Sequence, residues 1–84
     1  MKHAGSAALD ALEPVLAQLR AISGLKEKNR GTFYRRSKAF LHFHEDSAGF
    51  FADLKKGDDF VRLSVNNHRE IAALIREAKR ALAD

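Results

Sequence analysis

The chain has 84 residues, of which 45% are hydrophobic and 31% charged, a composition typical of one globular domain and not of a disordered chain. It has no cysteine, which excludes disulfides, thiolate metal sites and thiol catalysis, and which favours a reducing, cytoplasmic setting. No run of about 20 apolar residues could span a bilayer, and the net charge of +4 does not by itself identify a nucleic-acid-binding protein.

The N-terminal part predicts a helix. The chain starts with a basic stretch like that of a signal peptide, but Asp10, Glu13 and Pro14 interrupt the apolar region that such a peptide needs. Apolar residues recur at helical spacing at Leu9, Leu12, Leu16, Leu19 and Ile22. Either the main helix begins at Pro14, or a short helical turn over residues 6–12 precedes it with a bend. Gly24 is expected to end the helix.

Strand-like segments follow, separated by turn residues. The predicted strands are 31–36, 38–44, 49–55 and 60–65. Short loops between consecutive strands make them antiparallel neighbours.

The C-terminal part predicts a second helix. Asn67 and Glu70 form a plausible capping pair at its start. An amphipathic stripe follows at Ile71, Leu74, Ile75, Ala78 and Leu82. We therefore expect one α+β domain over residues 1–84: an N-terminal helix, a four-stranded antiparallel meander and a C-terminal helix, in a two-layer sandwich.

Alternation of side chains along each strand assigns residues to the two faces of the sheet. We pair Phe43 with Phe50 across the second hairpin and Leu54 with Val61 across the third. One face is then apolar and is expected to lie under the helices, with Tyr34, Leu41, Phe43, Phe50, Ala52, Leu54, Val61, Leu63 and Val65. The opposite face, called the open face below, receives Phe33, Arg35, Phe40, His42, His44, Phe51, Lys55 and Phe60.

The open face is too aromatic for a surface without a partner. Four of the six phenylalanines lie there, and the same pairing places Asp53 opposite Arg62. We predict a non-enzymatic domain without a cofactor that forms a homodimer through this face, since symmetric pairs are the commonest oligomers. The predicted interface residues are Phe33, Phe40, Phe51, Phe60, His42, His44 and Arg62.

A nucleic-acid platform is the first alternative. Segment 26–38 carries six basic residues and one acidic residue. Aromatic side chains on an open sheet stack unpaired bases, and neighbouring cations neutralise phosphates. Phe33, Phe40 and Phe51 would stack in this interpretation. The phosphates would be contacted by Arg35, Arg36, Lys38, Lys55 and Arg62. A simpler interpretation is a charged edge strand that prevents edge-to-edge aggregation.

A metal site is the second alternative. His42 and His44 are two residues apart on one strand, so they share a face with Cα atoms roughly 6.5–7 Å apart. Two imidazoles at this separation can bind one divalent ion, with a carboxylate supplied by Asp46, Glu45 or Asp53. No third ligand has a diagnostic spacing. Ser23, Ser37, Ser47 and Ser64 show no nucleophile motif, so the sequence predicts no catalytic residue.

The central hairpin resembles that of the MmcQ/YjbR-like bacterial proteins. The resemblance lies in residues 38–43 (KAFLHF) and residues 51–55 (FADLK), and with their surroundings it covers about a third of the chain. It implies a small α+β domain whose sheet leads into a C-terminal helix. DNA binding has been suggested for this family from its fold. Fold likeness alone does not determine an activity.

Overall fold

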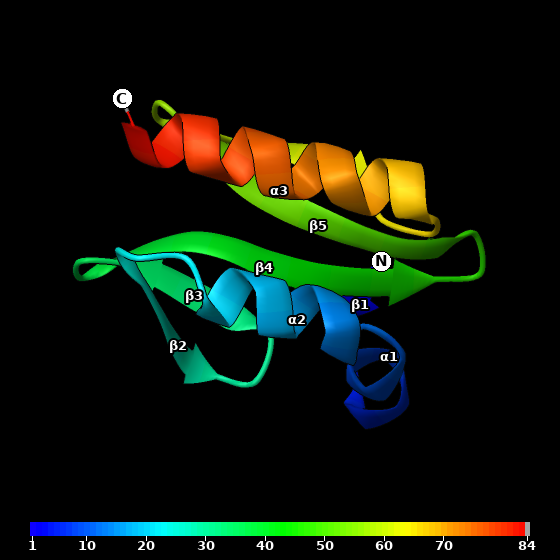
Figure 1. The fold of residues 1–84 in the computed structure, drawn as a ribbon. Helices are drawn as coiled ribbons and strands as arrows, with labels where there is room; N and C mark the ends of the chain where they lie inside the picture. The colour runs from blue at the N-terminus through cyan, green and yellow to red at the C-terminus, as the bar shows by residue number, and fades with distance from the viewer. Residues whose placement is uncertain (84) are drawn as a thin grey trace.

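The computed structural model describes residues 1–83, which form an antiparallel six-stranded sheet and three helices (Figure 1). In chain order the elements are β1 (Lys2–His3), α1 (Ser6–Ala11), α2 (Glu13–Arg20), β2 (Leu25–Asn29), β3 (Thr32–Arg35), β4 (Lys38–Asp46), β5 (Gly49–Lys56), β6 (Asp59–Ser64) and α3 (His68–Ala83). The predicted α+β class, antiparallel sheet and C-terminal helix are confirmed. The predicted strand number and the single N-terminal helix are wrong. No helix within residues 1–83 is long and apolar enough to cross a membrane.

The N-terminal helical region is divided at Leu12. This residue ends α1 and precedes α2, and its amide hydrogen-bonds to Ala8 O. Pro14 lies in the first turn of α2, where its missing N–H leaves no intrahelical bond unmade. Of the two predicted arrangements, the structure therefore has the short helix followed by a bend. Val15, Leu16 and Leu19 of α2 are buried.

Five strands form a meander in the order β2-β3-β4-β5-β6, and the predicted strands correspond to the last four. β2 was missed because its residues, LKEKN, are mostly charged and lie at the edge of the sheet. β1 pairs with the C-terminal part of β4, through Lys2 with Glu45 and His3 with His44. Because β3 pairs with β4 only as far as His42, β1 continues the same edge of β4 beyond the end of β3.

Both long helices cover one face of the sheet, with α2 over the β4 side and α3 over the β5 side (Figure 1). Asn67 caps α3 by accepting a hydrogen bond of 2.9 Å from the Glu70 amide, as the capping pair predicted. The buried apolar cluster between the helices and the sheet includes Leu16, Leu19, Phe33, Leu41, Phe43, Ala52, Leu54 and Leu74. Within residues 1–83 the other face of the sheet carries no helix.

The registers of the last two hairpins were predicted with different success. Leu54 pairs with Val61 as expected, although β6 is an edge strand and leaves Val61 38% exposed. Phe43 pairs with Ala52 instead of Phe50, because the turn between β4 and β5 contains only two residues. A shift of two residues leaves every side chain on its predicted face, so the assignment of faces survives this error.

A β-bulge at Phe40 reverses the predicted faces of the first hairpin. Phe33 pairs with Leu41 but Tyr34 pairs with Ala39, so Phe40 is an extra residue in β4. Phe33 therefore shares the helix-covered face with Leu41 and is 0% exposed, and Phe40 is 3% exposed in the same core cluster. The predicted placement of both phenylalanines on the open face is wrong. The predicted core position of Tyr34 is also wrong, since it is half-buried beneath the Lys28 ammonium, 4.3 Å from the ring centroid.

Candidate metal centre

The open face carries fewer phenylalanines than the sequence predicted, and histidines form a larger part of it. Only Phe51 and Phe60 of the four predicted aromatics remain there, with Phe51 partly buried and Phe60 42% exposed. His44 lies between His3 on one neighbouring strand and Phe51 on the other. His42 packs against the Phe60 ring with 5.1 Å between centroids. The predicted aromatic surface is therefore a mixed histidine and phenylalanine surface.

His3 is the member of this surface that the sequence did not single out. It lies on β1, which is held against β4 by the amide of Ala4 donating to Phe43 O at 3.0 Å. The Gly5 amide adds a 2.6 Å hydrogen bond to the Glu45 carboxylate. These contacts fix the short strand on both sides of its pairing with His44, so the His3 ring faces the same side of the sheet as His44.

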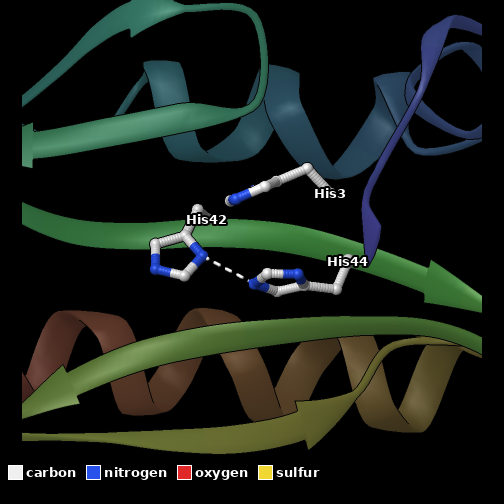
Figure 2. Close-up of side chains that lie close together, drawn as sticks. All are labelled: His3, His42 and His44. Atoms are coloured by element: carbon white, nitrogen blue, oxygen red, sulfur yellow. Dashed lines mark hydrogen bonds between the residues drawn. The ribbon is translucent and has the colours of Figure 1, made fainter. Parts of the chain in front are cut away.

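The three histidines form one cluster, seen from the open face with the helices behind the sheet in Figure 2. One ring nitrogen from each lies within 4.8 Å of the other two. The closest approach is 2.9 Å between His42 Nδ1 and His44 Nε2. In a tetrahedral zinc site, Zn–N bonds of about 2.0–2.1 Å place ligand nitrogens roughly 3.3–3.4 Å apart. Small side-chain rotations would therefore bring the three nitrogens to the spacing of a zinc site.

A carboxylate and a guanidinium border the cluster. Asp53 lies on β5 and pairs with His42 on β4 and with Arg62 on β6, as the predicted Asp53–Arg62 pair required. Its Oδ2 atom lies 3.2 Å from His44 Nε2, and both carboxylate oxygens accept 2.8 Å hydrogen bonds from Arg62. These Arg62 hydrogen bonds lower the pKa of Asp53 although its burial opposes the shift. Asp53 therefore stays ionised beside the imidazoles at neutral pH.

The protonation state of His42 suits metal binding. Burial lowers the pKa of His42, and the neighbouring His44 lowers it further. A neutral imidazole keeps a lone pair for a metal ion, which a protonated imidazole lacks. The buried His44 Nδ1 atom has no hydrogen-bond partner among residues 1–83. In the metal-free protein a proton on Nε2 lets His44 donate toward His42 or Asp53, and an ion that binds Nε2 requires this proton to move to the buried Nδ1 atom.

Asp46 does not belong to the cluster. Its carboxylate accepts a 2.8 Å hydrogen bond from the Ala48 amide and stabilises the turn between β4 and β5. Of the carboxylates considered for this site, the one beside the histidines is therefore Asp53 and not Asp46.

The predicted phosphate-contacting residues are divided between two places. Arg62 lies on the open face and is bound to Asp53. The others, Arg35, Arg36, Lys38 and Lys55, line a single hollow at the far end of the sheet. The predicted stacking residues Phe33 and Phe40 are buried, so they offer no open ring to a base.

Comparison with protein-family models, curated proteins and solved structures finds no match for this chain. The resemblance of the central hairpin to the MmcQ/YjbR-like proteins therefore stays a prediction. A functional assignment depends on the geometry and chemistry of the residues described above.

Proposed function

We propose that this protein binds a divalent transition-metal ion of the zinc class through His3, His42 and His44. The observation that supports the proposal is the convergence of three imidazoles from two paired strands, with ligand atoms within 4.8 Å of one another. Imidazole nitrogen suits zinc, copper and nickel, whereas calcium and magnesium prefer oxygen ligands.

Asp53 is the natural fourth group of this site. An ion between His42 and His44 would lie beside the Asp53 carboxylate, whose Oδ2 atom is 3.2 Å from His44 Nε2. Because this is the same nitrogen that would bind the ion, Asp53 would act as a direct fourth ligand and not as a partner of the other ring nitrogen. Arg62 holds the carboxylate in place with two hydrogen bonds. The neutralising Arg62 also moderates the affinity, since Asp53 already has a cationic partner.

Metal binding of this kind would join the N-terminal strand to the centre of the sheet. His3 belongs to β1, which has two residues, while the other two ligands belong to the nine-residue β4. An ion shared by both strands would stabilise the folded state, because the unfolded chain does not present the three imidazoles together. The proposed role is therefore a metal-binding module, and no chemical reaction is assigned to it.

Thermal unfolding with and without zinc chloride tests the proposal. At a free zinc concentration 100 times the dissociation constant, we expect a stabilisation of about 2.7 kcal/mol in the wild-type protein. This corresponds to a rise in Tm of roughly 10–20 °C for a domain of this size. His3→Ala and His42→Ala should lose most of the rise. The exposed His68, at the start of α3 and outside the cluster, provides the control His68→Ala, which should keep it.

Two results would contradict the proposal. One is a wild-type protein whose melting temperature does not respond to zinc, nickel or copper. The other is a zinc effect that His3→Ala and His42→Ala retain in full, since the ion would then bind elsewhere. Loss of the zinc-dependent rise in melting temperature in His68→Ala alone would also mean that the ion binds outside the cluster.

A further inference from the structure

A basic hollow lies where the turns of two hairpins meet the C-terminal end of α3. Its volume is about 610 Å³, within the range of small-ligand sites. Six cationic side chains line it: Arg35, Arg36, Lys38, Lys55, Lys56 and Arg80. Asp58 and Glu77 are its two acidic lining residues. The excess of cations in this one place is as large as the net charge of +4 of the whole chain.

Some of these cations already have protein partners, and others do not. Lys56 and Arg80 contact the Glu77 carboxylate at 2.6 and 3.3 Å. Arg35 donates to the carbonyl oxygens at the end of α3, where the helix dipole favours a positive charge. The side chains of Arg36 and Lys38 make no hydrogen bond or ion pair within residues 1–83. These two side chains therefore remain available for an anion.

The backbone at Arg36 is a second, independent observation. Arg36 has φ +59°, a left-handed conformation that strains a residue with a Cβ atom and that glycine adopts freely. It is the one residue other than glycine with positive φ in the described part of the chain. Arg36 thus combines a strained turn conformation with an unpaired cationic side chain that lines the basic hollow. Strain of this kind is typical of functional positions, and it indicates that the side chain of Arg36, and not its backbone, accounts for an arginine here.

The distribution of charge decides between a small ligand and a polynucleotide. The cations come from the β3–β4 turn, the β5–β6 hairpin and α3, and they surround one hollow. A strand of nucleic acid needs cations and open aromatic rings along a path. On the adjoining open face Arg62 is already bound to Asp53, and the predicted stacking residues Phe33 and Phe40 are buried, which leaves Phe51 and Phe60 as its only phenylalanines among residues 1–83. The wall formed by Ala39, Phe40 and Ala81 suits the organic part of a small molecule.

We propose that the basic hollow binds a small phosphorylated metabolite of about mononucleotide size, with Arg36 and Lys38 contacting its phosphate. This proposal does not depend on the histidine cluster. A guanidinium donates two parallel hydrogen bonds to a phosphate, and an ammonium adds a point charge.

Calorimetric titration with AMP, in EDTA and at 20 mM NaCl, tests the proposal without a contribution from metal. We expect saturable binding to the wild-type protein that weakens on addition of salt. Arg36→Gly should weaken it by about tenfold to a hundredfold, the effect of losing a charged hydrogen-bond donor. The same variant should melt at the wild-type temperature or above it, because glycine relieves the strained turn. A loss of binding with retained stability separates a ligand contact from a structural role.

The control is Arg69→Gln, which removes one positive charge near the opposite end of the 16-residue helix α3. It should bind AMP as the wild type does. Equal weakening by both variants would mean attraction by net charge alone and would overturn the proposal. So would the absence of AMP binding at low salt. Tighter binding of a single-stranded oligonucleotide than of AMP, weakened by Phe51→Ala on the open face, would identify a polynucleotide as the occupant and would also overturn it.

Discussion

Replacing Phe33 and Phe60 separately by alanine tests the bulge that distinguishes the two faces of the sheet. Alternation without a bulge places both rings on the open face, whereas the structure has Phe33 0% exposed and Phe60 42% exposed. Removing a fully buried phenylalanine costs about 3–5 kcal/mol in lost transfer energy and a residual cavity. The Phe60 ring contacts only the Lys55 ammonium and the His42 ring among the aromatic and cation–π pairs of residues 1–83, so its removal should cost about 1 kcal/mol or less.

Urea unfolding followed by circular dichroism measures both values. A domain of this length has a total stability of about 4–13 kcal/mol, so Phe33→Ala consumes a large part of it. If that variant does not fold, Phe33→Leu provides the comparison at an expected cost of about 1–2 kcal/mol. Similar costs for Phe33→Ala and Phe60→Ala would refute the bulge. So would a cost at Phe60 that exceeds the cost at Phe33.

Two further predictions concern pH and solution mass. Because the pKa of His42 is lowered in the folded protein, its contribution to stability is complete above the ordinary histidine value of about 6.5 and is lost as the pH falls below it. The lowered pKa of Asp53 adds a second loss below about pH 3.9, so melting temperatures measured from pH 8 to pH 3 should fall in two steps, and His42→Gln should remove the first. The homodimer expected from the sequence stays a prediction, and light scattering at tens of micromolar decides it. A mass of twice 9.4 kDa that Phe60→Glu halves would support the homodimer, and a wild-type monomer would contradict it.

Local sequence patterns were sufficient to predict four of the six strands of the sheet. The β5–β6 hairpin was predicted with its register, because a short turn and strict alternation leave one pairing that buries Leu54. The β4–β5 register was wrong by two residues, and the faces were unaffected because side chains repeat with a period of two. The bulge at Phe40 changed the period by one residue, and a run of consecutive apolar residues gives no local sign of where such an insertion lies.

Local sequence patterns also identified only part of the candidate metal centre, because one of its residues is brought in by a contact distant in the sequence. The sequence identified His42 and His44 because side chains two residues apart on a strand lie on the same face of the sheet. His3 was missed because β1 has only two residues and pairs with a segment about 40 positions later. Neither periodicity nor propensity can identify a two-residue strand, whose position depends on tertiary contacts. The available signal was compositional: His3 is one of only four histidines in the chain.

The two proposed sites use different parts of β4, with Lys38 at its first residue and the histidines in its second half. Lys38 and His42, the nearer of the two β4 histidines, are four residues apart, which is roughly 13 Å along an antiparallel strand. This separation exceeds the Debye length of about 8 Å at physiological ionic strength, so charge bound at one site is largely screened from the other. The Asp53–Arg62 ion pair on the neighbouring strands has no net charge, so it adds little to the electrostatic interaction between the two sites. A small sheet can therefore carry a neutral imidazole site and a basic site on one strand, provided that its length separates them.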